Sequence, residues 1–193
     1  LKFCLCQELF LPKHFMKASP MRKVIVTGGN KGIGYAIIKG LFAGETPFDI
    51  TLTTRTLKNG EVAVQQIQES VKNSKSTLRT KQLNITDPLS IQHFADWVKH
   101  ELGPIDVLIN NAGIGFWPET KTQKLETINT NLFGTMSLTE KLLPFLSTEG
   151  KIIMMSSGLG KISRQGPEVQ KILADPNLTE DKFLELSGKL YEQ

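Results

Sequence analysis

The chain has 193 residues, of which 39% are hydrophobic and 22% are charged, a composition typical of one globular domain with a substantial core. No apolar run approaches the roughly 18 residues that a membrane-spanning helix needs, so we expect no membrane segment. The formal net charge of +4 is concentrated in residues 1–23, which hold five of the 23 basic residues and one of the 19 acidic ones. The remaining body carries 18 charges of each sign and no basic run, which argues against nucleic-acid binding.

Residues 1–20 differ in character from the rest of the chain. Both cysteines, Cys4 and Cys6, lie there with only His14 nearby, so a disulfide framework is excluded and a closed zinc site lacks ligands. We therefore predict no metal centre. The fold pattern begins at Met21, and we expect the leader before it to be disordered or not native, the alternative being a weak basic targeting segment.

Short apolar runs rich in β-branched residues alternate with segments of helical periodicity from Met21 onward. The alternation predicts strands at 23–27, 48–53, 79–83, 105–110 and 150–155, separated by helices at 31–43, 59–72, 88–102 and 127–146. The third helix has the clearest signals, because Asp87 can cap it and Pro88 suits its first position. Such alternation predicts an α/β fold, a doubly wound parallel sheet of Rossmann type, over residues 21–193.

The pattern changes after the fifth strand. Residues 166–193 predict two short helices broken at 175–177, and no sixth strand follows. A fifth strand at the sheet edge would expose unpaired backbone groups beside apolar surface that later elements normally cover. We therefore expect the fold to lack its last strands and helices, unless something else covers this edge.

Four glycines separate the first strand from the first helix in the segment VIVTGGNKGIGYAII. They are Gly28, Gly29, Gly32 and Gly34. Glycines here permit a tight turn and let the backbone approach a pyrophosphate, whose charge suits the free N–H groups at the helix start. A plain turn is the alternative, but the order of strand, loop and helix favours a dinucleotide site.

The second strand ends at Thr54 and Arg55, about twenty residues after the glycine loop, where an NAD site normally offers an acidic residue to the ribose 2′-hydroxyl. An acid would repel a 2′-phosphate, whereas a guanidinium pairs with it. Lys31 in the loop adds a second cation. This end of the strand favours NADPH over NADH, unless Arg55 is an ordinary surface residue.

Four motifs then occur in a characteristic order. Thr27 precedes a Gly-x-x-x-Gly-x-Gly loop, NNAG occupies 110–113, TNLFGT occupies 130–135, and IIMMSS ends at Ser157. In order and spacing they resemble the short-chain dehydrogenase/reductase family over residues 21–160. The resemblance implies that the dinucleotide is held by Gly28, Asn30, Lys31, Gly32, Ile33, Gly34, Arg55, Asn84, Ile85, Asn111 and Gly113.

At Asn84 this chain departs from the family pattern. Members of the family carry an aspartate in this segment, which contacts adenine, and an apolar residue follows it. Here Asn84 is followed by Ile85. The resemblance implies that the amide keeps the contact with adenine while the charge is lost.

Within the family the chain is most similar to the NADPH-dependent carbonyl reductases, on the loop TGGNKGIG and on the helical segment after residue 165. That resemblance implies reduction of small-molecule ketones, aldehydes or quinones to alcohols, in the cytoplasm. In those enzymes a helical insertion covers the face that other members use to oligomerise. We therefore expect a monomer.

The family's catalytic residues are only partly present. A tyrosine donates the proton, a lysine four residues later lowers its pKa, a serine hydrogen-bonds the substrate oxygen, and an asparagine positions a water. The resemblance assigns the last two roles to Ser157 and Asn131, the alternatives being a serine that satisfies a loop amide and a structural helix asparagine. Many members carry the tyrosine where this chain has Gln170, whereas members with a long insertion carry it several dozen residues later. We expect neither Tyr35 nor Tyr191 to serve.

The sequence therefore predicts the front part of a reductase without its proton donor. The alternative is a catalytically silent protein that binds NADPH. Two rings after the NNAG motif, Phe116 and Trp117, either line the mouth of the pocket or pack in the core.

Overall fold

A computed structural model describes residues 21–117, 120–179, 181–183 and 185. Its centre is a five-stranded sheet in which every neighbouring pair is parallel. The expectations for residues 1–20 and for Tyr191 lie outside the described residues. The strands are β1 (Arg22–Val26), β2 (Phe48–Thr54), β3 (Thr77–Gln82), β4 (Ile105–Asn110) and β5 (Leu146–Met154).

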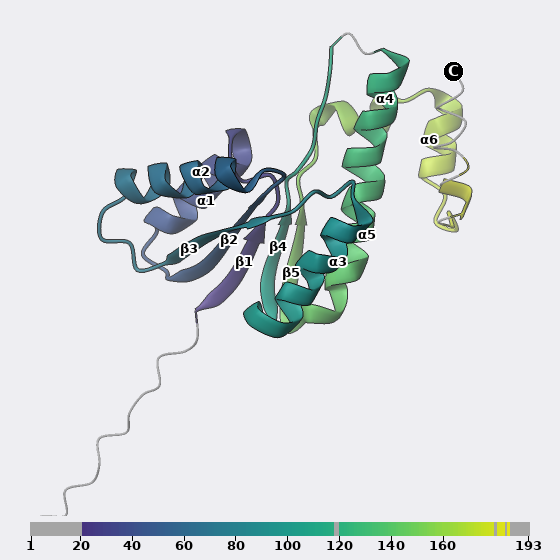
Figure 1. The fold of residues 1–193 in the computed structure, drawn as a ribbon. Helices are drawn as coiled ribbons and strands as arrows, with labels where there is room; N and C mark the ends of the chain where they lie inside the picture. The colour runs from purple at the N-terminus through teal and green to yellow at the C-terminus, as the bar shows by residue number, and fades with distance from the viewer. Residues whose placement is uncertain (1–20, 118–119, 180, 184, 186–193) are drawn as a thin grey trace, which may run out of the picture.

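The strand order β3-β2-β1-β4-β5 confirms the predicted doubly wound sheet. The chain moves outward from β1 to β3 and then crosses to the other side of β1 for β4 and β5. Helices α1 (Gly32–Ala43) and α2 (Leu57–Ser70) cover one face of the sheet, and α3 (Pro88–Trp97) and α5 (Thr135–Leu142) cover the other (Figure 1). Ligands bind such sheets where the order reverses, here at the carboxyl ends of β1 and β4.

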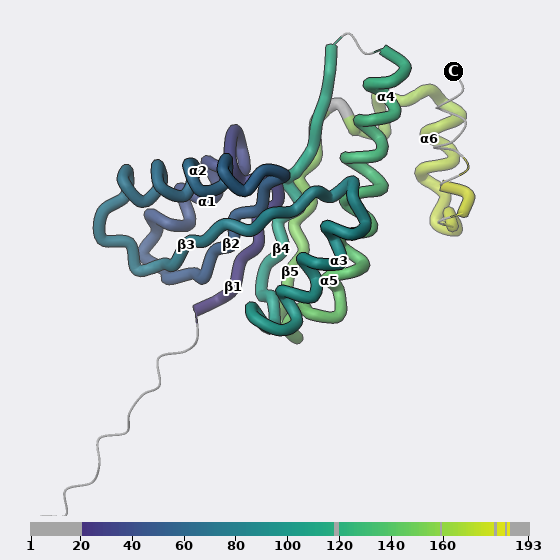
Figure 2. Tube along the Cα trace, viewed as in Figure 1, coloured from purple at the N-terminus to yellow at the C-terminus, as the bar shows by residue number. Residues whose placement is uncertain are grey.

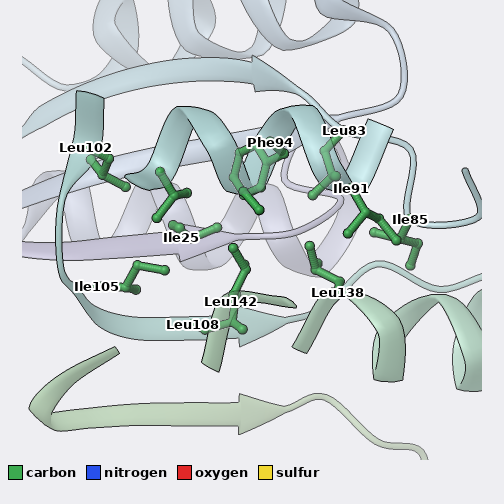
Figure 3. Packing of buried hydrophobic residues seen from close by; sticks show 12 residues of the cluster. Ile25, Leu83, Ile85, Ile91, Phe94, Leu102, Ile105, Leu108, Leu138 and Leu142 are labelled. Atoms are coloured by element: carbon green, nitrogen blue, oxygen red, sulfur yellow. The ribbon is translucent and has the colours of Figure 1, made fainter. Parts of the chain in front are cut away.

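The core consists of two apolar clusters, one on each face of the sheet. Strand β1 contributes to both, because Ile25 points to the α3 and α5 side while Val24 and Val26 point to the α1 and α2 side. In the first cluster Phe94 of α3 and Leu138 of α5 pack over the sheet (Figure 3). Burial on both faces explains why β1 and β4 contain continuous apolar runs.

The third helix begins as predicted. The Asp87 carboxylate accepts a hydrogen bond from the Leu89 N–H at 3.0 Å, and Pro88 occupies the first turn. The last turn, η1 (Val98–Leu102), is a wider π-helical turn, and the helix ends at Gly103 with a φ of 77°. The Lys23 ammonium donates to the Leu102 carbonyl, which ties this end of the helix to β1.

The helix predicted at 127–146 has different ends. It begins with α4 (Lys121–Ile128), continues through the π-helical turn η2 (Asn129–Gly134) into α5, and ends in the short 3₁₀ turn η3 (Leu143–Phe145). The tube in Figure 2 follows these pieces as one column. The early start has a clear cause, since the side chains of Thr120 and Gln123 each accept a hydrogen bond from the other's backbone N–H.

Strand β5 begins earlier than predicted but pairs regularly only in its second half. Leu146 aligns with Ile105, whereas Lys151 aligns with Val107, so residues 147–150 bulge out of the ladder. Among the described residues β5 pairs with β4 alone. At its end the side chains of Ile153, Met154 and Met155 are 43%, 56% and 42% exposed, as expected for an apolar edge.

After β5 the chain forms two 3₁₀ turns, η4 (Gly158–Gly160) and η5 (Ile162–Arg164), and the helix α6 (Pro167–Leu173). Helix α6 corresponds to the first of the two short helices predicted after residue 165. The second falls largely outside the described residues. None of the described helices is both long and apolar enough to cross a bilayer.

Candidate functional site

A cavity of about 530 Å³ opens at the carboxyl ends of the strands. Its wall is built by the loops that follow β1, β2, β3 and β4. Among the described lining residues two are cationic, Lys31 and Arg55, and none carries a carboxylate. The cavity therefore suits an anionic ligand. It brings together ten of the eleven residues predicted to hold a dinucleotide, namely Gly28, Asn30, Lys31, Gly32, Ile33, Arg55, Asn84, Ile85, Asn111 and Gly113.

Gly34 is the eleventh, and it is buried rather than on the cavity wall. A Cβ at this position would lie 2.5 Å from the Asn111 side-chain nitrogen and 2.7 Å from the Gly28 carbonyl oxygen. Gly28 itself has a φ of 63°, and its Cβ would lie 3.0 Å from the Ala112 backbone. The motif glycines thus allow the loop after β1 to pack directly against the loop after β4.

The amino end of α1 faces this loop without a capping side chain. Lys31 stands at the N-cap position with an extended backbone and makes no capping hydrogen bond, and the first turn contains no acidic residue. The first backbone N–H groups of a helix have no intrahelical partners, and they favour an anion. Asn30 and Lys31 line the cavity beside them.

Thr27 and Asn111 join the two loops. The Asn111 side-chain nitrogen donates to the backbone carbonyls of Thr27 at 2.8 Å and of Gly28 at 3.3 Å. The buried Thr27 hydroxyl accepts from the backbone N–H groups of Asn111 and Ala112. Asn111 therefore positions the glycine loop as well as lining the cavity.

The end of β2 presents Arg55 to the cavity on a fixed backbone. The Arg55 carbonyl accepts from the Gln82 side chain at 2.9 Å, and the Thr54 carbonyl accepts from the Leu83 N–H at 2.9 Å. The Arg55 side chain is exposed, as a group that binds a phosphate at the rim would be.

Several lining residues were not among the predicted ones. All of them have uncharged side chains. They are Thr53, Thr54, Thr56, Asn59, Leu83, Thr86, Ala112, Ile114 and Thr130. Most are sequence neighbours of Arg55, Asn84 or Asn111. Asn59 is different, because it reaches the cavity from the first turn of α2. Its distance of four residues from Arg55 does not predict this, because Arg55 precedes the helix.

Asn131 lies in the π-helical turn η2 and holds the loop after β4. Its side-chain oxygen accepts from the Ile114 N–H at 2.8 Å, and its side-chain nitrogen donates to the Ile114 carbonyl at 2.8 Å. Ile114 and Thr130 line the cavity, but Asn131 does not. Asn131 thus acts on the cavity through Ile114.

Ser157 follows β5 at the same carboxyl edge of the sheet. It is exposed, and its carbonyl accepts from the Gly160 N–H at 3.0 Å in the turn that leads to η4. Ser157 does not line the cavity. Because β5 is the next strand after β4, the serine belongs to the β4 side of the site, away from Arg55.

Tyr35 and Lys39 have the spacing Tyr-x-x-x-Lys, but they lie on α1. Tyr35 is half-buried and packs against the core cluster under α1 and α2. That face of the sheet is opposite to the one covered by α5, which continues from Asn131. Tyr35 is therefore not placed to work with Asn131 and Ser157.

The two rings after the NNAG motif separate in the structure. Trp117 is 96% exposed, so core packing is excluded for this side chain. Phe116 is half-buried. Neither ring lines the cavity described above.

Comparisons with known proteins agree with this architecture. Carbonyl reductase [NADPH] 1 of Homo sapiens is 36% identical over 184 residues, which cover 91% of this chain and 64% of that protein. Carbonyl reductase [NADPH] 3 of Mus musculus gives the same identity and the same coverage. The chain thus spans less than two thirds of the length of these relatives.

Solved structures share the fold. The menthone neomenthol reductase of Mentha piperita superposes with a TM-score of 0.80 at 25% identity, over 90% of this chain and 74% of that one. The NADPH-bound carbonyl reductase from chicken fatty liver gives a TM-score of 0.60 at 30% identity, over 74% of this chain and 60% of that one. A family model described as short chain dehydrogenase matches residues 22–169. The chain therefore belongs to the short-chain dehydrogenase family.

Proposed function

We propose that this protein binds NADPH in the cavity. The pyrophosphate lies on the glycine loop and the start of α1, and the 2′-phosphate lies between Arg55 and Lys31. The observation that carries the proposal is the lining of the cavity, where Arg55 follows β2 and no described carboxylate is present. An acidic residue at this strand end would select the free ribose hydroxyl of NADH, whereas a guanidinium favours the phosphorylated coenzyme.

The proposed reaction is the reduction of a small-molecule ketone, aldehyde or quinone to an alcohol. When bound, the coenzyme supplies a hydride. The nicotinamide end of the ligand belongs on the β4 side, because the phosphates of the adenosine half occupy the β1 and β2 side. There Ser157 hydrogen-bonds the substrate oxygen, and Asn131 holds the loop at Ile114. The names of the similar carbonyl reductases support this assignment.

A second candidate function is NADPH binding without turnover. Reduction also needs a proton on the alcohol oxygen, and a general acid contributes about 10²–10⁴ to the rate. The chain has two tyrosines, of which Tyr35 packs on the opposite face of the sheet and Tyr191 lies outside the described residues. We propose that the described residues include no efficient proton donor and that turnover is slow.

The two functions are separated by measuring binding and turnover on the same sample. NADPH affinity is obtained by calorimetry, and NADPH oxidation is followed with a quinone and with an aromatic aldehyde. We expect binding together with slow turnover. Turnover as fast as that of a typical reductase would contradict the proposal that an efficient proton donor is lacking. If the folded protein did not bind NADPH, both functions would be contradicted.

The role of Ser157 is tested against its neighbour. Ser156 and Ser157 are both exposed and adjacent, so Ser156→Ala is a matched control for Ser157→Ala. We expect the residual turnover to fall in the Ser157 variant alone, with NADPH affinity unchanged in both. Equal turnover in the two variants would contradict the assignment.

The same proposal includes a monomeric protein that works in the cytoplasm, as the resemblance to the carbonyl reductases implies. Light scattering coupled to gel filtration tests the first part. A mass of twice 21.5 kDa would contradict it.

A further inference from the structure

We propose that Asn84 recognises position 6 of the purine base with a hydrogen-bond donor, so that this protein accepts a 6-oxopurine coenzyme as well as the adenine coenzyme. The inference rests on the proposed function, because it concerns the base of the dinucleotide held in the same cavity. It goes beyond that function by naming the atom that contacts the base and the preference that results.

The position of the base follows from the strand order. The glycine loop follows β1, Arg55 follows β2, and Asn84 follows β3, which is the next strand outward. A dinucleotide with its pyrophosphate at β1 and its ribose 2′-substituent at β2 therefore has its base beside the end of β3. Asn84, Ile85 and Thr86 line the cavity there.

The orientation of the Asn84 amide is set by Thr86. The Asn84 side-chain oxygen accepts from the Thr86 backbone N–H at 3.3 Å and from the Thr86 hydroxyl at 2.9 Å. A backbone N–H can only donate, so the atom turned toward it is the carbonyl oxygen and not the nitrogen. This is an Asx turn, which Asn and Asp form equally well.

The backbone of this turn is held as well. The Asn84 N–H donates to the Ser90 hydroxyl at 2.9 Å, and the Asn84 carbonyl accepts from the Asp87 N–H at 3.1 Å. Among the described residues no acceptor pairs with the Asn84 side-chain nitrogen. The group that Asn84 offers to a ligand is therefore an N–H donor, and turning the amide over would leave the Thr86 backbone N–H without its acceptor.

An N–H donor and the 6-amino group of adenine do not complement one another, because that amino group is itself a donor. The amide can still donate to a ring nitrogen of adenine, so NADPH remains a ligand. The 6-carbonyl of hypoxanthine is an acceptor and pairs with the amide directly. In Asn84→Asp one oxygen keeps the Thr86 contact, and the outward atom becomes an acceptor that favours the 6-amino group.

The test compares two coenzymes that differ at position 6. Dissociation constants are measured for NADPH and for reduced nicotinamide hypoxanthine dinucleotide phosphate, with the wild-type protein and with Asn84→Asp. We expect the wild-type protein to bind both within about threefold, and Asn84→Asp to prefer NADPH by about tenfold. The added charge weakens both coenzymes alike, so the ratio of the two constants isolates the contact at position 6.

Asn73→Asp is the matched control. Asn73 is exposed and has a φ of 63°, a backbone conformation that Asp also tolerates, and it precedes β3 at the opposite end of the sheet from the cavity. The same change of charge there is expected to leave the ratio at its wild-type value.

Each outcome decides the inference. A wild-type preference for NADPH of about tenfold or more would overturn it even if Asn84→Asp failed to fold. An unchanged ratio in a folded Asn84→Asp protein would also overturn it, and in both cases NADPH binding would leave the proposed function standing. Absence of binding of either coenzyme to the folded wild-type protein would overturn the proposed function, and this inference with it.

Discussion

Asn111 donates two hydrogen bonds to Thr27, one from its side chain and one from its backbone. The Asn111 side chain donates to the Thr27 carbonyl at 2.8 Å, and the Thr27 hydroxyl accepts from the Asn111 N–H at 2.9 Å. The same hydroxyl accepts from the Ala112 N–H at 2.8 Å. One threonine thus fixes the loop after β4 against the loop after β1, and the two loops form the middle of the cavity wall.

Thr27→Val is expected to weaken the contact between the loop after β1 and the loop after β4. Valine has the shape of threonine but no acceptor, so two backbone N–H groups lose their partner. We expect the free energy of unfolding to fall by about 1–3 kcal/mol, measured by urea denaturation, and the NADPH affinity to fall with it. Thr27→Ser keeps the oxygen, and equal losses in the two variants would show that the hydroxyl is not responsible.

Gly60→Ala is expected to destabilise the contact between α2 and the sheet. A Cβ on the buried Gly60 would lie 2.0 Å from the Thr80 hydroxyl and 2.8 Å from the Thr54 side chain. The helix must shift to admit it, which costs about 1–3 kcal/mol in thermal or urea unfolding. A neutral result would mean that α2 packs less closely than the structure indicates.

Gly40→Ala, on the neighbouring helix α1, is expected to raise the stability of the protein. Gly40 lies within α1, and no atom lies within 4 Å of its ideal Cβ position. Replacing glycine by alanine in an open helical position stabilises a protein by about 0.5–1 kcal/mol. A loss of stability in Gly40→Ala would contradict the described packing of α1.

Asn131→Ala is expected to weaken coenzyme binding although Asn131 does not line the cavity. The substitution removes both hydrogen bonds to Ile114, which lines the cavity. We expect the NADPH dissociation constant to rise about fivefold in a titration, since the loop after Gly113 loses its anchor. Asn129 is exposed in the same turn, and Asn129→Ala serves as the control. A similar rise in the control would assign the effect to the helix rather than to Ile114.

Local rules predicted much of the fold. The alternation of apolar runs and helical segments located all five strands and indicated that they run parallel, and the cap at Asp87 located α3. The start of α4 was predicted too late, because the capping box of Thr120 and Gln123 stands in a segment with little apolar periodicity. The bulge at 147–150 depends on how β5 meets β4, which a single strand's sequence does not contain.

The candidate site also has features that the sequence predicted and features that it did not. The glycine spacing and Arg55 pointed to the cavity because each acts through its own backbone or charge. The acceptor role of Thr27 could not be predicted, since it depends on a loop brought close by folding. The donor orientation of Asn84 depends on a local Asx turn with Thr86, which the sequence permits but does not require. Thr27 meets a loop more than 80 residues away in the chain, with 84 positions separating it from Asn111.

The central claim is that Arg55 makes this cavity a site for the phosphorylated coenzyme, and one measurement tests it most directly. Calorimetric dissociation constants for NADPH and NADH are compared in the wild-type protein, in Arg55→Gln, and in Lys75→Gln, a control at an exposed lysine before β3. We expect the wild-type and control proteins to bind NADPH at least about tenfold more tightly than NADH, and Arg55→Gln to lose most of that preference. Equal affinities for the two coenzymes, or a preference that survives in Arg55→Gln, would contradict the account.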